Sequence, residues 1–465
     1  MQSSEASALE VANGPLEYIA RGHAHSQNGQ LLDAASCFEN ALRLDANLPM
    51  AHNNLGWIRE SQGEIEAALL CYRQALNLNA KFELALENYA SLLSRLGRNA
   101  EAQPVWLSLA TSRPNDRALL DKVISISLAN GDIATAASLA EQHAMITRGS
   151  EWSNISANGI PVPDAPFPAP LLSAAKLKHD IEQLSYLLER KVLEADLLPI
   201  IRGYQEVLER VELLGDDARA ELSNDDRNLI GRAYGRIVYR YPAAKVAKAL
   251  SQSWDTKAAE EEYLRSALGI VVLDDFLTRD ALLSLRHFCA TSTIWFTNRY
   301  RFGRLGAFFR EGFNCPLLTQ IAEELRAAFP KVIGEKHRLM QTWGFKYNYT
   351  QPAMGAHADF AAVNVNFWLT TEDANKGGGG LVIYDTEAPA EWDFPSYNGM
   401  RGSMVDDFLT DHYARSITVP YRANRAVIFN SDLFHTTEPF RFRDGYENRR
   451  VNVTMLFGKR EDAFR

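Results

Sequence analysis

The sequence predicts a multidomain chain of α and β parts: an N-terminal solenoid of helical hairpins, a middle helical segment and a C-terminal double-stranded β-helix, or jelly roll. Three observations predict this fold class. About 150 N-terminal residues repeat with a period of 34, five prolines then fall within ten residues, and short β-rich runs begin at residue 269. A length of 465 residues also exceeds one ordinary core of about 100–200 residues.

The composition is that of a folded protein, and the chain lacks the net positive charge that attracts nucleic acid. Hydrophobic residues make up 46% of the chain, charged residues make up 23%, and the formal net charge is −9. Nucleic acid is therefore not an expected partner. The sequence has no signal-peptide pattern, no run of about 18 apolar residues and four scattered cysteines. We expect a cytoplasmic protein with no membrane partner.

The 34-residue repeat has the columns that stacked helical hairpins need. Glycine, small, alanine and aromatic positions recur at one interval: Gly29, Gly63, Gly97 and Gly131; Gly22, Gly56 and Ala90; Ala34, Ala68, Ala102 and Ala136; Phe38, Tyr72 and Trp106. A small residue lets two helices cross closely, an aromatic ring fills the groove, and a glycine joins the helices.

This array resembles tetratricopeptide repeats over about residues 15–145, and we assign residues 15–148 to it. The fourth copy departs from the columns at Ile124 and Ala140, as a capping repeat would. Such an array is a binding surface more often than a catalyst. We expect it to bind a protein or peptide substrate or partner, or a second copy of the chain in a homodimer.

Residues 149–170 are predicted to be a proline-rich linker, because prolines in the run from 161 to 170 favour an extended chain. Helical patterning returns at 171–215, and a second helical stretch follows to about residue 265. We expect the segment 171–265 to be a helical layer that packs on the C-terminal domain and carries no chemistry.

The C-terminal domain, residues 266–460, contains a candidate metal-binding set. His357 and Asp359 are two residues apart, so on an extended segment both side chains point to one side. His435 follows the run AVIF at 426–429 and lies 435 − 357 = 78 residues further on. Two imidazoles and one carboxylate form the facial set that leaves three positions open on Fe(II). A His-x-Asp pair alone arises by chance, so the prediction needs this third ligand.

Two adjacent arginines precede the last β-rich run, VNVTMLF at 451–457, and strand alternation separates them. Arg450 shares a face with Asn452 and Thr454, whereas Arg449 shares the apolar face. The apolar face must pack outward, so Arg450 is predicted to lie in the lumen, where its planar guanidinium suits a carboxylate of a 2-oxoacid. Arg449 is expected to be an exposed charge outside the site.

About residues 268–460 resemble the 2-oxoglutarate- and Fe(II)-dependent dioxygenases, and look most like their prolyl-hydroxylase-like branch. The resemblance rests on HADF at 357–360, the segment FNSDLFH that ends at His435, and Arg450 with Asn452, all in the family's order. It implies that His357, Asp359 and His435 are the catalytic, iron-binding residues.

The resemblance also implies the co-substrate contacts and the reaction. Arg450 would hold the distal carboxylate of 2-oxoglutarate, with help from Asn452 and from Tyr349, which shares a strand face with Tyr347. 2-Oxoglutarate and O2 would become succinate and CO2 while an unactivated C–H bond is hydroxylated.

Other residues of this domain have open roles. Asn364, Asn366 and Trp368 form the polar face of VNVNFWL at 363–369 and line either the cavity or an ordinary sheet face. His412 is an alternative third ligand, although its context favours an exposed position.

A long insertion separates the runs LVIY at 381–384 and AVIF. It contains Trp392, Tyr397 and Asn398, and a substrate lid could be located there.

The leading function is hydroxylation of a protein or peptide side chain, with the repeat array presenting the substrate. The alternatives are a free amino acid or small metabolite as substrate, or an interaction scaffold without catalysis. A nucleobase demethylase is disfavoured, because Leu456 replaces the arginine that follows in that family and because the chain is acidic.

Overall fold

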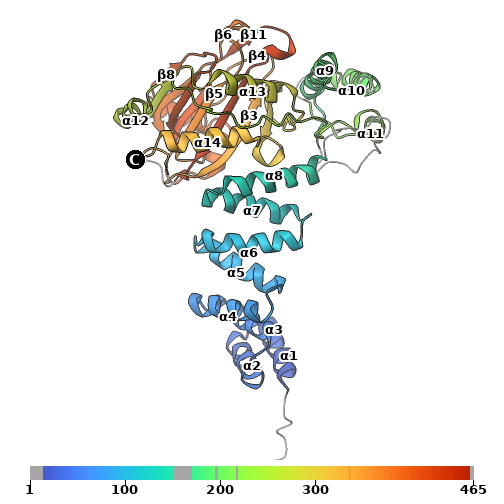
Figure 1. Cartoon of the computed structure of the whole chain (residues 1–465), viewed down its shortest axis with the longest axis vertical. Coiled ribbons are helices and arrows are strands. Elements are labelled where there is room, and N and C mark those ends of the chain that lie inside the picture. Colours follow the sequence, from blue (N-terminus) through green and yellow to red (C-terminus); the bar gives the residue numbers. More distant parts are fainter. Residues whose placement is uncertain (1–13, 150–169, 194–196, 216–217, 335, 461–465) are drawn as a thin grey trace, which may run out of the picture. The chain divides into compact units, whose positions relative to one another are not determined.

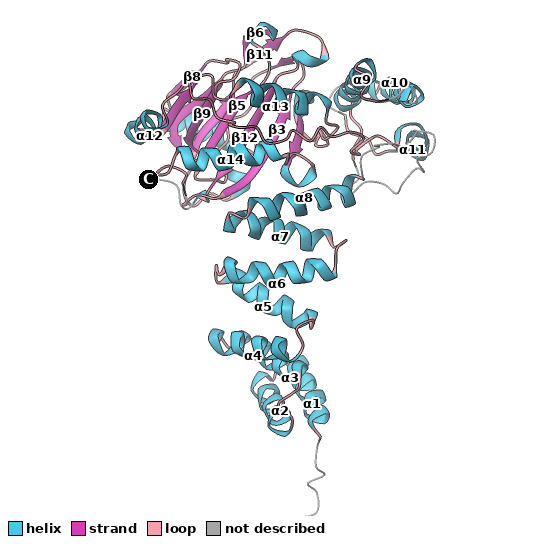
Figure 2. Cartoon of the chain, in the orientation of Figure 1, coloured by secondary structure: helices cyan, strands magenta, loops and turns pink. Residues whose placement is uncertain are grey.

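The computed structural model describes residues 14–149, 170–193, 197–215, 218–334 and 336–460 (Figures 1 and 2). The chain divides into two compact units, Met1–Ile126 and Ser127–Arg465. The sequence analysis placed the end of the array at residue 148, whereas this division falls 22 residues earlier, at 148 − 126. The predicted linker, apart from its two end residues, lies outside the described residues.

The N-terminal unit consists of helical hairpins with a left-handed glycine between the paired helices. Its helices are α1 (Pro15–Gln27), α2 (Leu31–Leu44), α3 (Pro49–Ser61), α4 (Ile65–Leu78), α5 (Glu83–Arg95) and α6 (Asn99–Ser112), and α7 (Arg117–Asn130) crosses the division. Gly29, Gly63 and Gly97 turn the chain with φ of 75°, 80° and 71°. A Cβ atom at Gly56 would lie 2.8 Å from the Tyr72 ring, so the small and aromatic columns do meet.

Helix α8 (Ile133–Arg148) is part of the C-terminal unit and packs on it through polar contacts. His143 Nδ1 lies 3.0 Å from the carbonyl oxygen of Arg310, and Arg148 Nε donates to Glu311 Oε1 at 3.0 Å. The Arg148 guanidinium also stacks over the Phe296 ring, 4.6 Å from its centroid. The last helix of the predicted array is therefore built into the unit that holds the β-sheets.

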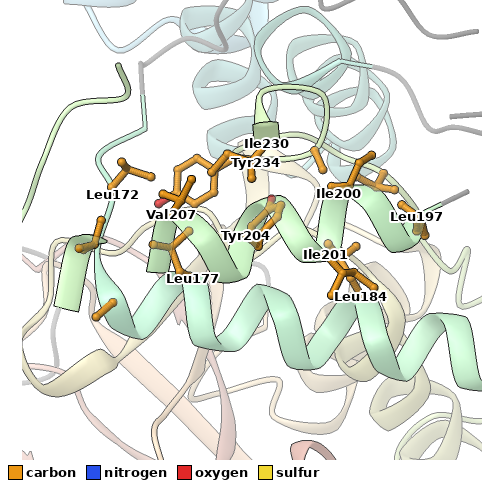
Figure 3. Packing of buried hydrophobic residues seen from close by; sticks show 14 residues of the cluster. Leu172, Leu177, Leu184, Leu197, Ile200, Ile201, Tyr204, Val207, Ile230 and Tyr234 are labelled. Atoms are coloured by element: carbon orange, nitrogen blue, oxygen red, sulfur yellow. The ribbon is translucent and has the colours of Figure 1, made fainter. Parts of the chain in front are cut away.

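The middle segment contributes α9 (Ala174–Glu189), α10 (Leu198–Glu212), α11 (Asn224–Ile230) and α12 (Thr256–Arg265). Figure 3 shows the apolar cluster between α9, α10 and α11, which includes Leu177, Leu184, Tyr204 and Tyr234. The prediction of one further helical stretch to residue 265 was wrong in part. Residues 231–255 form turns and irregular chain, because Gly235 adopts φ of 73° and Pro242 cannot donate a helical hydrogen bond.

Antiparallel sheets form the rest of the unit. The six-stranded sheet has the order β1 (Ile270–Leu273), β9 (Ala426–Asn430), β5 (Val363–Trp368), β12 (Val451–Phe457), β3 (Leu339–Lys346), β2 (Leu305–Phe308). One three-stranded sheet has the order β10 (Leu433–Thr437), β7 (Leu381–Glu387), β8 (Ser416–Val419), and the other has the order β4 (Thr350–Gln351), β11 (Phe440–Phe442), β6 (Asn375–Gly378).

The remaining elements are helical. They are α13 (Arg279–Thr291), α14 (Pro316–Ala328), α15 (Phe394–Tyr397), α16 (Met404–Asp411) and the short 3₁₀ turns Arg301–Gly303, Phe309–Glu311, Glu372–Ala374 and Tyr446–Asn448. No described helix is long and apolar enough to cross a membrane.

Strand β12 shows how the six-stranded sheet sorts its two faces. Asn452 lies opposite Trp368 of β5 and Phe345 of β3, so these side chains share one face, which we call the inner face. Val453 lies opposite Phe367 and Gly344 on the other face. There Gly344 approaches the Phe313 and Trp295 rings so closely that a Cβ would lie 2.7 Å from Phe313. The outer face is thus covered, and the polar residues of β12 point inward.

Candidate active site

His357, Asp359 and His435 meet at one point of the β-sheet region. Each offers one ligand atom, and no two of these atoms are more than 4.8 Å apart. Atoms bonded to one first-row metal ion at about 2 Å lie a little closer together than this, so small side-chain movements bring all three onto one ion. Two imidazoles and a carboxylate are the donor set of facial Fe(II) sites. The three predicted ligands are brought together, and they fit this metal.

Hydrogen bonds orient two of the three ligands. His435 Nδ1 lies 3.0 Å from the carbonyl oxygen of Leu433, which makes Nδ1 the protonated nitrogen and leaves the Nε2 lone pair for a metal. Asn364 Nδ2 donates to Asp359 Oδ2 at 2.8 Å. His435 Nε2 is 3.5 Å from the same carboxylate oxygen. Asn364 of the inner face therefore serves the site.

The charge states of the ligands suit a cation. Burial and the neighbouring His435 lower the pKa of His357 to about 4, so its imidazole is neutral at pH 7. Burial alone would raise the pKa of Asp359, but the neighbouring His435 and His357 rings and the hydrogen bond from Asn364 hold this pKa below its usual value. A buried carboxylate beside the neutral His357 leaves a negative charge for a metal ion to neutralise.

The insertion between β7 and β9 holds the segment that carries His357 and Asp359. Ala358, between the two ligands, donates its N–H to the carbonyl oxygen of Tyr397 at 2.8 Å, and its own carbonyl oxygen accepts from Asn398 Nδ2 at 3.1 Å. The insertion thus anchors the metal-binding loop. His412 of the insertion is exposed and stacks on Phe408, so it lies with the surface, as the sequence analysis expected.

Arg450 is a buried cation in an aromatic environment. Its Nη2 and Nε donate to the Gly379 carbonyl oxygen at 2.8 and 3.2 Å, and its Nη1 donates to Asn452 Oδ1 at 3.2 Å. The guanidinium lies 4.9 Å from the Tyr347 ring centroid and 5.2 Å from that of Phe440. Within the described ranges no carboxylate is close enough to pair with it. A buried charge of this kind is prepared to pair with an anion.

Several buried polar atoms of this sheet region also lack partners among the described residues. They are Oδ1 of Asn364, Oδ1 of Asn366, and both amide atoms of Gln351. Gln351 lies opposite Phe440 in the β4–β11 pair, so its side chain is on the face of that small sheet that contacts Arg450. Buried polar atoms are normally hydrogen-bonded, so these atoms mark a place for a polar ligand.

The sequence reasoning missed Gln351. Nothing in the pattern identified it, because β4 is two residues long and its place beside Phe440 depends on a pairing with β11, about ninety residues later.

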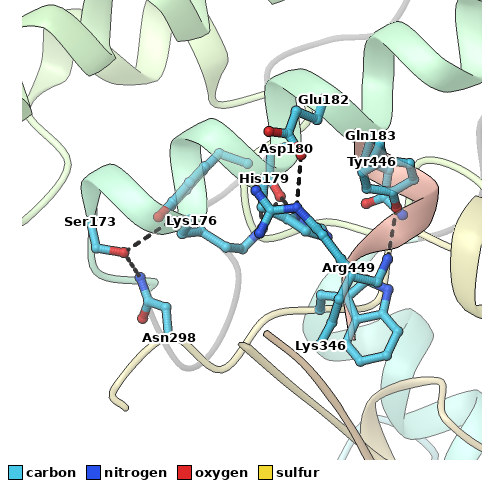
Figure 4. Close-up of polar contacts among 12 residues, drawn as sticks. Ser173, Lys176, His179, Asp180, Glu182, Gln183, Asn298, Lys346, Tyr446 and Arg449 are labelled. Carbon is cyan, nitrogen blue, oxygen red and sulfur yellow. Dashed lines mark hydrogen bonds and ion pairs between the residues drawn. The ribbon is translucent and has the colours of Figure 1, made fainter. Parts of the chain in front are cut away.

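Two residues are not where the sequence analysis placed them. Tyr349 does not join Tyr347 at Arg450, because the strand ends at Lys346; its hydroxyl donates to Glu182 Oε2 at 2.8 Å. Arg449 is buried, not exposed: its Nε donates to Glu182 at 2.7 Å (Figure 4). Its guanidinium also stacks on the Tyr349 ring. The sequence pattern could not show that α9 packs over this position.

The family model of the tetratricopeptide repeat matches residues 18–48 and 51–82. The N-terminal hairpins are therefore tetratricopeptide repeats. No match to a curated protein was found.

Three solved structures illustrate the similarity of the chain to known proteins. YrrB, described as a tetratricopeptide-repeat protein with an unusual peptide-binding site, is 17% identical over 30% of this chain and 77% of its own, with a TM-score of 0.27. The first repeat domain of Spaghetti (RPAP3), bound to an HSP90 peptide, is 18% identical over 25% and 91%, with a TM-score of 0.24. MamA from Desulfovibrio magneticus RS-1 is 13% identical over 43% and 97%, with a TM-score of 0.26.

Proposed function

We propose that the chain is an Fe(II)- and 2-oxoglutarate-dependent dioxygenase that hydroxylates an unactivated C–H bond, in a protein or peptide side chain. One observation carries the proposal: the two-histidine, one-carboxylate set occurs in the same β-sheet region as Arg450, a buried cation that lacks an anionic partner among the described residues. A metal site alone fits many enzymes. A metal site together with a buried carboxylate receptor fits a metal that works with an organic acid.

The sheet architecture supports a jelly roll as the finer description of the fold. The six-stranded antiparallel sheet and the two three-stranded sheets contribute buried residues to one apolar core, as the two layers of a jelly roll would. His357 and His435 join the segment before β5 to β10 of a smaller sheet. The metal ligands would then sit at one end of the lumen, between the layers.

The residues of the chain prepare the metal site. His357, Asp359 and His435 would hold Fe(II), and bound iron together with 2-oxoglutarate and O2 supplies the oxidising power that no side chain has. The chain keeps the His357 imidazole neutral through burial and fixes the His435 tautomer through the Leu433 carbonyl oxygen. Asn364 holds the Asp359 carboxylate in one orientation.

Arg450 would bind the distal carboxylate of 2-oxoglutarate. Its guanidinium has two donors directed at the Gly379 carbonyl oxygen and one at Asn452, and the surrounding rings exclude water. Removal of water strengthens the attraction between this cation and a carboxylate. The amide of Gln351 and the free oxygen of Asn366 can accept or donate hydrogen bonds to the rest of the co-substrate.

The repeat array would bring the protein or peptide. Leu16, Met50 and Leu84 occupy the same position of three successive hairpins, 34 residues apart, and each is at least half exposed. A row of exposed apolar side chains on a repeat surface is typical of a contact surface for another chain. If the array instead binds a partner unrelated to catalysis, the substrate is a free amino acid or small metabolite, or the chain is a scaffold.

The test is the formation of succinate. Purified full-length protein with Fe(II), 2-oxoglutarate and O2 should form succinate, at least slowly and without added substrate, whereas His357→Ala should not. His412→Ala, which changes an exposed histidine, is the matched control and should keep full activity. Succinate at the same level in wild type and His357→Ala would refute the proposal.

A further inference from the structure

Arg304 is a second cation on the inner face of the six-stranded sheet. Leu305 of the edge strand β2 lies opposite Lys346, and Gly306 lies opposite Phe345, which faces inward. Arg304 precedes Leu305 in extended backbone, with φ of −71° and ψ of 127°, so its side chain shares the face of Gly306 and Phe345. Its guanidinium lies 4.6 Å from the centroid of the Phe345 ring, as this alternation requires.

Arg304 has no polar partner in the part of the chain that the structure describes. Its Nε is buried and lacks a hydrogen-bond acceptor, and its guanidinium contacts two aromatic rings, Phe345 and, at 4.2 Å, Tyr300. Arg449 and Arg425, two other arginines of this unit, each have a carboxylate partner. An arginine held by aromatic faces with its donors unused is prepared for an anion.

Arg304 is close enough to the candidate site to act on it. Burial is the largest cause of the lowered pKa of both His357 and Arg450, and the charge of Arg304 lowers both pKa values further. Arg450, between Gly379 and Asn452 in the interior, is enclosed by its rings, whereas Arg304 is on the edge strand and is partly exposed. The two cations therefore differ in access: one is enclosed, and the other can be reached from outside the sheet.

We propose that Arg304 binds a carboxylate of the substrate, so that this site selects an acidic peptide. The inference rests on the proposed function and adds a substrate class to it. The Arg304 guanidinium would pair with an Asp or Glu side chain or with a C-terminal carboxylate, while Tyr300 and Phe345 hold the guanidinium in place. Arg450 stays reserved for the co-substrate, because a peptide chain cannot enter its enclosed position.

The experiment compares three pools of capped octapeptides on the full-length protein, loaded with Fe(II) and 2-oxoglutarate without oxygen. The pools are randomised with uncharged residues except at one central residue, which is Glu in the first and Gln in the second; the third pool has Gln there and an uncapped C-terminal carboxylate. Retained peptides are measured by mass spectrometry. Wild type should retain one carboxylate pool about tenfold more than the neutral pool, and the third pool tells which carboxylate is bound.

Variants assign the preference to Arg304. Arg304→Gln should abolish the preference, and Arg304→Lys, which keeps the charge without the planar fork, should weaken it about threefold. Arg299→Gln changes an exposed arginine that also contacts Tyr300 and should keep the preference. If Arg304→Gln does not fold, the lysine variant gives the answer by itself: an unchanged preference contradicts the proposal.

Three further results would overturn the proposal. The first is equal retention of all pools by wild type, including retention of none, and the second is an equal loss of the carboxylate preference in Arg299→Gln. The third is loss of 2-oxoglutarate binding in Arg304→Gln, which would assign Arg304 to the co-substrate. Failure of the proposed oxygenase function has a different signature, because wild type would then fail to bind 2-oxoglutarate whatever peptides it retains.

Discussion

His357 and His435 exchange two backbone hydrogen bonds: the His357 N–H donates to the His435 carbonyl oxygen at 3.0 Å, and the His435 N–H donates to the His357 carbonyl oxygen at 2.8 Å. This isolated antiparallel bridge places the two ring centroids 4.5 Å apart. The backbone pairing therefore brings the two imidazoles together. Such preorganisation lowers the entropic cost of binding a metal.

The anchor of the metal-binding loop is the first point to test. Asn398→Ala removes the hydrogen bond to the Ala358 carbonyl oxygen, between two metal ligands, without removing a ligand. We expect Fe(II) affinity to fall about tenfold or more, as is typical when a group behind the ligands is lost. Anaerobic titration with Fe(II) measures this. Met400→Ala, at an exposed position of the same insertion, should leave the affinity unchanged; equal affinities in both variants would contradict the anchoring role.

The adjacent arginines should have separable roles. Arg450→Ala leaves the co-substrate carboxylate without its cation and should cost about 2–5 kcal/mol of 2-oxoglutarate binding, while Fe(II) still binds. Arg449→Ala should instead lower the free energy of unfolding by about 2 kcal/mol, because it removes a buried charged hydrogen bond to Glu182. Co-substrate titration and chemical denaturation of both variants measure the two effects. Equal losses of co-substrate affinity would show that the register of β12 is misassigned.

Truncation tests where the catalytic unit begins. Removal of residues 1–115 keeps α7 and α8 whole and should leave a folded protein that still forms succinate. Removal of residues 1–150 also deletes α8. This removes the contacts of His143 with the Arg310 carbonyl oxygen and of Arg148 with Glu311, and it exposes the surface on which α8 packs. We expect the shorter protein to melt at a lower temperature or to aggregate. Similar melting temperatures for the two proteins would show that α8 is dispensable.

His179 should make folding stability depend on pH. It is completely buried in the polar network of Figure 4, where burial and then the charges of Lys346, Arg449 and Lys176 hold its pKa well below the usual value. The folded protein keeps His179 neutral, whereas the unfolded chain binds a proton near pH 6.5. The unfolding free energy should therefore fall as pH drops below about 6.5, by up to about 1.4 kcal/mol per pH unit for this one proton.

Urea denaturation from pH 7.5 to pH 5 measures this dependence. His179→Gln should reduce the slope by the contribution of one proton and leave the part that His357 contributes, even if the variant is less stable at every pH. His412→Gln, at an exposed position, should follow the wild-type curve. A wild-type slope in His179→Gln would assign the pH dependence to other groups.

The sequence was sufficient to predict structural features that follow a regular residue period. The 34-residue spacing identified the repeats, and their small and aromatic columns do meet, as Gly22 and Phe38 show: a Cβ at Gly22 would lie 2.7 Å from the ring. Strand alternation placed Asn452 and Thr454 opposite the inward residues of β5. These features are local, so neighbouring residues in the chain determine them.

Contacts between distant segments could not be derived in this way. Arg449 and Tyr349 looked available for solvent or co-substrate, but Glu182 of α9 pairs with both. Gln351 and Arg304 had no motif to mark them. Gln351 is positioned by the pairing of β4 with β11. Arg304 is positioned by the pairing of the edge strand β2 with β3.

The sequence by itself determined the repeat array, the alternation of β12 and the residue types that can hold a metal. Only the tertiary structure decided that His357 and His435 face each other, that α8 packs within the C-terminal unit and that Arg304 and Arg450 lack anionic partners among the described residues. The physical reason is that periodicity follows from backbone geometry within one segment, whereas burial and pairing depend on which remote segments pack together.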